Sequence, residues 1–236
     1  MSASPRDRIA LALDVDDPGD ALDLARRCAP HAGTFKIGPA LLLAGGPAWL
    51  IALRGLGRRL FFDLKLYDIP ETVARTVREA KRKGADLLTV HVAGGSRMMR
   101  AAADAAAGSG HPVALIGVTV LTAFDQAQLE QEWELREPIP DRVVRWAKLA
   151  RDSGLAGVVC SPLEIESVRA AVGSESLLVV PGIRSAGDRP DDQRRTMTAS
   201  EAAARGADLL VIGRTVLRAS DPAAALAALA AQVESP

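Results

Sequence analysis

Eight short apolar segments recur along the chain, and longer alanine-rich amphipathic stretches separate them. The segments cover residues 9–13, 34–37, 60–64, 87–92, 113–120, 157–160, 177–180 and 209–212. Continuous runs rich in Val, Ile and Leu are typical of parallel strands that are buried on both faces. The pattern therefore predicts eight buried parallel strands that alternate with helices.

The stretches between the apolar segments carry helix signals. We expect helices over residues 18–28, 71–83, 96–107, 140–153, 162–172 and 200–205. Pro18 and Pro162 stand at expected first helical positions. Proline is common there, because the backbone N–H that it lacks would have no partner within the helix. Gly84, Gly154 and Gly206 follow expected helix ends, where a left-handed backbone favours glycine.

Strands that alternate with helices predict a parallel sheet, either open and doubly wound or closed into a barrel. Eight such units in 236 residues favour closure, because (β/α)8 barrels have about 250 residues. No G-x-G-x-x-G motif opens the first expected helix, which disfavours an open dinucleotide-binding sheet. We therefore expect an α/β fold, a single-domain (β/α)8 TIM barrel over residues 1–236.

Composition excludes several classes of function. The net charge is +0 and aromatics make up 3% of residues, whereas nucleic-acid binding usually needs a basic patch and stacking aromatics. Cys28 and Cys160, like His31, His91 and His111, lack metal-ligand spacing. The first apolar segment is too short to span a membrane, and no signal peptide is visible. We expect no metal, nucleic-acid or membrane partner, and a cytoplasmic location.

Polar, charged or glycine residues end most of the apolar segments. They are Asp14, Lys36, Asp63, Lys65, His91, Thr122, Ser161, Gly182, Gly213 and Arg214. Active sites of (β/α)8 barrels lie at the carboxyl ends of the strands. A barrel would therefore gather these residues around one mouth.

Asp63 and Lys65 are two residues apart in the third segment, so a regular strand would direct both side chains to one face. Charges inside a barrel are costly unless they pair, and a purely structural ion pair is the simpler alternative. Asp14 and Lys36 hold corresponding strand ends, which favours an alternating Asp/Lys array at the mouth. Carboxylates around Lys65 favour its ammonium form, which suits a proton donor and a counter-charge for a carbanion.

Two arginines follow the last two segments, Arg184 in Pro-Gly-Ile-Arg and Arg214 after Gly213. The loops after strands seven and eight of such barrels frequently bind phosphate, and arginine offers a bidentate fork for it. Either arginine alone would more simply be a solvated surface charge, but the pair favours a phosphate site. We expect the polar segment 185–195 to be a mobile lid, with a passive surface loop as the alternative.

The motif D-x-K-x-x-D-I-P-x-T over residues 63–72 resembles the signature of the orotidine 5'-phosphate decarboxylase family. The resemblance spans nearly the whole chain, with Asp14, Lys36, His91, Thr122, Arg184 and Arg214 in the expected order. Sister sugar-phosphate decarboxylases share the D-x-K-x-x-D core. The combination with Ile-Pro and Pro-Gly-Ile-Arg is more specific.

The resemblance implies a cofactor-free enzyme that converts orotidine 5'-phosphate to uridine 5'-phosphate and carbon dioxide in pyrimidine biosynthesis. The implied catalytic residues are Lys65, Asp63, Asp68 and Lys36. Lys65 would protonate C6 of the pyrimidine, and Asp63 would face the departing carboxylate and orient Lys65. The implied substrate-binding residues are Asp14, Lys36, Thr72, Thr122, Arg184, Gln193, Gly213 and Arg214.

The resemblance also implies a homodimer in which Asp68 and Thr72 complete the partner's site. Two other functions stay open. A sister enzyme would act on a sugar phosphate with Mg²⁺ held by the acids, and a non-catalytic barrel would bind a nucleotide without turnover.

Overall fold

The computed structural model describes residues 4–184 and 196–233, and its centre is a closed barrel of eight parallel strands. The strands are β1 (Ile9–Ala12), β2 (Thr34–Ile37), β3 (Arg59–Leu66), β4 (Leu87–His91), β5 (Ala114–Val118), β6 (Gly157–Val159), β7 (Leu177–Val180) and β8 (Leu209–Ile212). Each strand pairs with the next, and β8 pairs with β1. The predicted (β/α)8 barrel is confirmed; the single-domain span 1–236 stays a prediction, because both termini lie outside the described residues.

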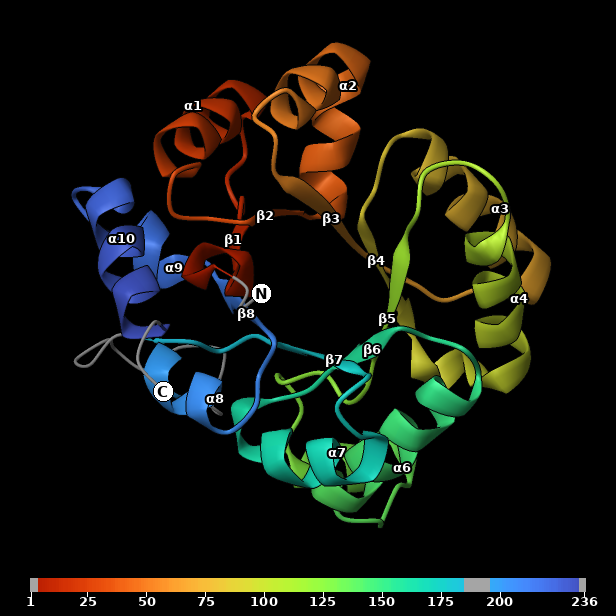
Figure 1. Ribbon diagram of the computed structural model, residues 1–236. Helices are drawn as coiled ribbons and strands as arrows, with labels where there is room; N and C mark the ends of the chain where they lie inside the picture. Colours follow the sequence, from red (N-terminus) through yellow and green to blue (C-terminus); the bar gives the residue numbers. More distant parts are fainter. Residues whose placement is uncertain (1–3, 185–195, 234–236) are drawn as a thin grey trace.

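Helices form a ring outside the strands, and the chain runs once around the barrel (Figure 1). The helices are α1 (Pro18–Cys28), α2 (Pro39–Arg54), α3 (Pro70–Arg82), α4 (Gly95–Ala107), α5 (Gln126–Trp133), α6 (Ile139–Asp152), α7 (Ile165–Val172), α8 (Ala199–Ala204), α9 (Arg214–Leu217) and α10 (Pro222–Val233). Three short 3-10 helices are also described: η1 (Pro5–Arg8), η2 (Val92–Gly94) and η3 (Pro162–Glu164). No described helix has the length and apolarity needed to cross a membrane.

Six of these helices match the predicted ranges, with ends displaced by a few residues. The range 162–172 is divided between η3 and α7. Helices α2, α5, α9 and α10 are not among the predicted helix ranges. The α2 sequence contains Gly-Gly-Pro, which usually marks a turn. The structure accommodates it with a kink at Gly46, whose φ is +68°.

The core consists of two apolar layers on either side of the strands. The outer layer packs the strands against the helices and includes Phe35 and Phe62, both fully buried. The inner layer fills the barrel with side chains from alternate strand positions, including Phe61, Ile116 and Val179. The barrel is therefore solid below its mouth, and only the carboxyl ends of the strands leave room for a ligand.

Two similar Arg–Asp clusters hold the opposite, amino-terminal face of the barrel. Asp208 Oδ2 accepts the Leu178 backbone N–H at 2.7 Å and lies 2.5 Å from Arg169 Nη2, which also donates to the Gly206 carbonyl. Around β3, Asp86 accepts the Leu60 N–H at 2.7 Å and pairs with Arg54, which also donates to the Gly84 carbonyl. In each cluster a helix, a strand and the next turn are tied together through one carboxylate.

We expect Asp208→Ala to destabilise the fold, because it leaves the Leu178 N–H and the Arg169 guanidinium without this acceptor. A lost charged hydrogen-bond partner of this kind costs about 1–3 kcal/mol, which lowers Tm by about 2–10 °C in a chain of this size. Thermal unfolding by circular dichroism measures the effect. The control is Asp23→Ala, which removes an exposed α1 ion pair with Arg26 and should change stability by less than about 0.5 kcal/mol. Equal Tm changes in both variants would contradict a structural role for the cluster.

Candidate active site

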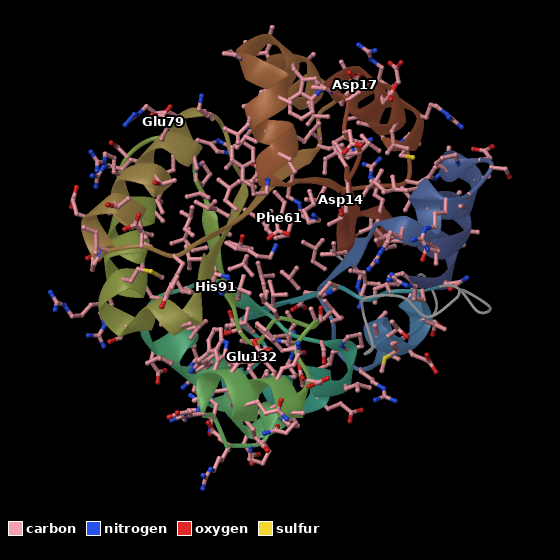
Figure 2. The ribbon with its side chains drawn as sticks, turned by 180° about the vertical axis from the view of Figure 1, so that it is seen from behind. Asp14, Asp17, Phe61, Glu79, His91 and Glu132 are labelled. Atoms are coloured by element: carbon pink, nitrogen blue, oxygen red, sulfur yellow. The ribbon has the colours of Figure 1, made fainter. Side chains whose placement is uncertain are left out.

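A cavity of about 430 Å³ opens at the carboxyl ends of the strands. Charged, polar and apolar residues line it, among them Asp14, Lys36, Asp63, Lys65, Val118, Val120, Thr122, Arg184, Gly213 and Arg214. Figure 2 shows Asp14 and Phe61 near the centre of the ring, whereas Asp17 and Glu79 lie on its outside. The barrel therefore brings side chains from distant parts of the chain to one mouth.

Four charged side chains from the first three strands form a continuous chain of ion pairs. Lys36 Nζ lies 3.0 Å from Asp14 Oδ1 and 3.5 Å from Asp63 Oδ2. Lys65 Nζ lies 2.8 Å from the same Asp63 Oδ2. Asp63 and Lys36 are largely buried, while Lys65 is 40% exposed and so is accessible from the cavity. The predicted alternation of Asp and Lys is present as direct contacts.

Asp63 stands at the centre of this network. Burial of its carboxyl acts to raise its pKa. The ammonium groups of Lys36 and Lys65 act in the opposite direction, as do hydrogen bonds from Lys65 and Thr89, and together they hold the pKa of Asp63 below its usual value. Asp63 is therefore an anion at neutral pH.

The predicted regular strand over Asp63 and Lys65 is wrong, because β3 is irregular at this point. Phe62 pairs with Leu88 and Leu66 pairs with Val90, so β3 bulges between these two pairs. Lys65 has a φ of +49°, a left-handed conformation that is uncommon for a residue other than glycine. The bulge, rather than a two-residue strand repeat, turns Lys65 toward Asp63 and the cavity.

Basic residues line another part of the same cavity. Arg184 follows β7, and Gly213 and Arg214 follow β8 at the start of α9. A Cβ on Gly213 would lie 3.8 Å from Asp14 Oδ2, so the backbone passes close to the charged network. The predicted phosphate residues and the predicted Asp/Lys array therefore share one cavity. Gln193 lies outside the described residues.

Valine side chains and Thr122 line a further part of the cavity wall. Val118 is the last residue of β5, Val120 follows the strand, and Val159 is the last residue of β6. Thr122, one of the predicted substrate-binding residues, also lines the cavity. A planar, partly apolar ring would find both an apolar wall and a hydroxyl on this side.

Asp68 and Thr72 do not line their own chain's cavity. Asp68 is exposed in the turn after β3, where its Oδ1 accepts the Ile69 backbone N–H at 2.6 Å. Tyr67 and Ile69 on either side of it are 66% and 67% exposed. This turn therefore presents one acid and two large hydrophobic side chains to the surface.

His91 ends β4 but does not line the cavity. Its ring makes an edge contact with Tyr67, with ring centres 6.0 Å apart. Burial and the charge of Lys65 lower the pKa of His91 against the opposing influence of Asp63. His91 is therefore neutral at pH 7 and contributes no charge to the network.

Thr89 is a contact of this network that the sequence patterns do not identify. It lies within the apolar run of β4, is fully buried, and contacts both Asp63 and Lys65. Its only signal in the sequence is a hydroxyl inside an otherwise apolar strand. In the described part of the chain, no three His, Cys, Asp or Glu side chains are grouped so that they would hold a metal ion.

Comparisons with known proteins agree with this geometry. Residues 7–229 match the model of the "Orotidine 5'-phosphate decarboxylase / HUMPS family". The orotidine 5'-phosphate decarboxylase of Paramagnetospirillum magneticum is 46% identical over 230 residues, covering 95% of this chain and 97% of the relative. That of Anaeromyxobacter sp. (strain K) is 48% identical over 227 residues, covering 96% and 98%. The crystal structure of orotidine 5'-phosphate decarboxylase from Lactobacillus acidophilus is 33% identical with a TM-score of 0.84, covering 96% and 99%.

Proposed function

This chain belongs to the orotidine 5'-phosphate decarboxylase family, and on that premise we propose that Lys65 is the proton donor in its conversion of orotidine 5'-phosphate to uridine 5'-phosphate and carbon dioxide. This reaction belongs to pyrimidine biosynthesis. The observation that carries the proposal is the contact of Lys65 Nζ with Asp63 Oδ2 at 2.8 Å inside the cavity that also holds Arg184 and Arg214.

The reaction requires one bond to break and one to form at C6 of the pyrimidine. The bond between C6 and the carboxylate carbon breaks, carbon dioxide leaves, and the electron pair stays on C6. A proton from Lys65 Nζ then forms the C6–H bond, and the resulting neutral amine regains a proton from solvent. The ammonium of Lys65 stabilises the negative charge as it develops, because its contact with Asp63 already orients it before substrate binds.

Asp63 has two functions in this proposal. Its Oδ2 contacts both lysines, so it holds them in place before substrate arrives. Placed beside the substrate carboxylate, this anion would also disfavour the bound substrate relative to the state in which carbon dioxide has left. Asp14 and Lys36, which are joined by a 3.0 Å contact, would bind the ribose hydroxyls.

Arg184, Gly213 and Arg214 would bind the 5'-phosphate, with Gln193 as a further ligand. Phosphate and reacting carbon would then lie at different parts of one cavity. Contacts with the phosphate would provide binding energy that orients the pyrimidine against Lys65. Thr122 would contact the pyrimidine amide edge.

The test of the activity is the loss of orotidine 5'-phosphate absorbance in the presence of EDTA. We expect turnover that a chelator leaves unchanged, with uridine 5'-phosphate as the product, because ammonium and carboxylate groups supply the chemistry. No turnover of orotidine 5'-phosphate, together with Mg²⁺-dependent decarboxylation of a sugar phosphate, would favour the sister reaction instead. Binding of uridine 5'-phosphate without any turnover would favour a non-catalytic nucleotide-binding protein.

We expect Arg214→Ala to weaken substrate binding and turnover together. A charged hydrogen bond contributes about 1.5–3 kcal/mol, so kcat/KM for orotidine 5'-phosphate should fall by about 10- to 150-fold. The control is orotidine, which lacks the phosphate, and which wild type and variant should decarboxylate equally slowly. An equal loss on both substrates would contradict phosphate binding by Arg214.

We further propose a homodimer in which Asp68 and Thr72 complete the partner's site. The exposed side chains of Tyr67 and Ile69 support this proposal, because large exposed hydrophobic side chains are frequent in protein interfaces. A cytoplasmic location is also proposed. The two cysteines, Cys28 and Cys160, are buried and form no disulfide, as is usual for proteins of reducing compartments.

A further inference from the structure

Thr89 lies on β4 opposite the bulge of β3 and is fully buried. It does not line the cavity, so a bound substrate would not touch it. Its hydroxyl nevertheless makes two hydrogen bonds to the Asp63–Lys65 pair. Oγ1 accepts the Lys65 backbone N–H at 2.8 Å and donates to Asp63 Oδ1 at 3.0 Å.

The directions of these two bonds follow from chemistry. A backbone N–H can only donate, and an ionised carboxylate can only accept. A hydroxyl has one proton and two acceptor lone pairs, so Thr89 satisfies both partners at once. Valine has the same shape and offers neither function.

The bond to the backbone stabilises the unusual conformation of Lys65. In a regular strand the Lys65 N–H would point toward β2, as the Arg59 N–H does when it bonds to the Gly33 carbonyl. The bulge between Phe62 and Leu66 breaks this alternation, and the Lys65 N–H meets β4 instead. A part-buried N–H needs another acceptor, and the Thr89 hydroxyl is that acceptor. The left-handed φ of +49° at Lys65 is a strained state that persists only where surrounding contacts impose it.

The bond to the carboxylate fixes the orientation of Asp63. Oδ1 is held by Thr89, so Oδ2 of the same group is directed to Lys65 Nζ at 2.8 Å and Lys36 Nζ at 3.5 Å. Rotation of the carboxylate would break the Thr89 bond and alter both lysine contacts. One hydroxyl therefore controls the backbone of Lys65 and the acceptor that orients its ammonium.

We propose that Thr89 is a positioning residue for this reaction, whose hydroxyl places Lys65 Nζ by fixing the Lys65 backbone turn and the Asp63 carboxylate together. The inference rests on the proposed function of Lys65. It concerns the rate of the chemical step, because the predicted ribose and phosphate contacts come from other strands. Loss of the hydroxyl should lower kcat while leaving KM and product affinity nearly unchanged.

The test compares Thr89→Val and Thr89→Ser with the wild-type protein. Misplacement of a reacting group by about 1 Å costs about 100-fold in rate, so kcat of Thr89→Val should fall by about that factor. Its KM and its Kd for uridine 5'-phosphate should stay within about threefold of wild type, because the contacts that bind ground state and transition state equally are unchanged. Thr89→Ser keeps the hydroxyl and should retain kcat within about fivefold of wild type.

Thr119→Val is the matched control. Thr119 is also a buried threonine beside a barrel strand, and its hydroxyl donates to the Val159 carbonyl at 2.7 Å without lining the charged cavity. Thr119→Val should be less stable than wild type, as Thr89→Val should be, but its kcat should stay within about threefold of wild type. An equal fall of kcat in both valine variants, or no fall in Thr89→Val, overturns the inference.

A variant that does not fold and a wild-type protein without activity each have a distinct interpretation. If Thr89→Val does not fold, Thr89→Ser and Thr89→Ala are compared, and kcat should differ by about tenfold or more at equal product affinity; equal kcat overturns the inference. If the wild-type protein does not decarboxylate orotidine 5'-phosphate, the proposed function has failed. An active wild type with an unaffected Thr89→Val shows instead that only the role of Thr89 is wrong.

Discussion

Replacing Lys65 with alanine is expected to lower kcat/KM for orotidine 5'-phosphate by about 10⁴-fold or more. The estimate combines about 10²–10⁴ for a positioned proton donor with about 10²–10³ for a fixed charge at the developing carbanion. We expect both contributions, proton donation and charge stabilisation, because the 2.8 Å contact with Asp63 orients the ammonium before substrate binds. Loss of substrate absorbance, followed to long times with concentrated enzyme, measures the residual rate.

A second substitution separates the two functions assigned to Lys65. Lys65→Arg keeps a positive charge beside Asp63, but guanidinium does not give up a proton at neutral pH. We expect Lys65→Arg to be almost as inactive as Lys65→Ala. A rate near that of wild type in Lys65→Arg would show that charge alone suffices and would contradict proton donation.

The matched control for these variants is Lys83→Ala. Lys83 follows α3 on the outside of the barrel, and its ion pair with Glu79 is long at 3.9 Å and exposed. Its loss should leave kcat/KM within about twofold, because exposed ion pairs contribute little. Binding of uridine 5'-phosphate by Lys65→Ala, measured by calorimetry, should show that the cavity is still folded.

Loss of Asp68 should be the second large effect, although Asp68 lies outside its own chain's cavity. If Asp68 completes the partner's site, Asp68→Ala should lower kcat/KM by about 100-fold or more, since a group that orients the reacting atoms is missing from each site. The exposed position of Asp68 between Tyr67 and Ile69 makes it available to a second copy of the chain. Steady-state kinetics of the purified variant measures this loss.

Mixed dimers determine which chain uses Asp68. A heterodimer of Lys65→Ala with Asp68→Ala, isolated with two affinity tags, keeps one site with Lys65 and the partner's Asp68 intact. It should have about half of the wild-type activity per dimer, because one of two symmetric sites survives. Wild type paired with the Lys65→Ala/Asp68→Ala double variant should be nearly inactive. The reverse pattern would place Asp68 in its own chain's site.

The sequence predicted the barrel because its signals are local. Buried parallel strands require continuous apolar runs, and each of the eight predicted segments overlaps one strand. Helix α2 was not predicted, because its local Gly-Gly-Pro sequence signals a turn. In the folded protein, packing against the barrel retains helix on both sides of a kink. Tertiary contacts overrode the local preference there.

For the candidate site, the sequence by itself determined which side chains end the strands, and the closed barrel then had to bring Asp14, Lys36 and Asp63 together. Only the tertiary structure decided how they meet. The bulge at Lys65 and its two contacts with Thr89 depend on the register between β3 and β4. A strand sequence sets its own alternation but does not encode alone which residue lies opposite it, because register depends on packing across the whole barrel.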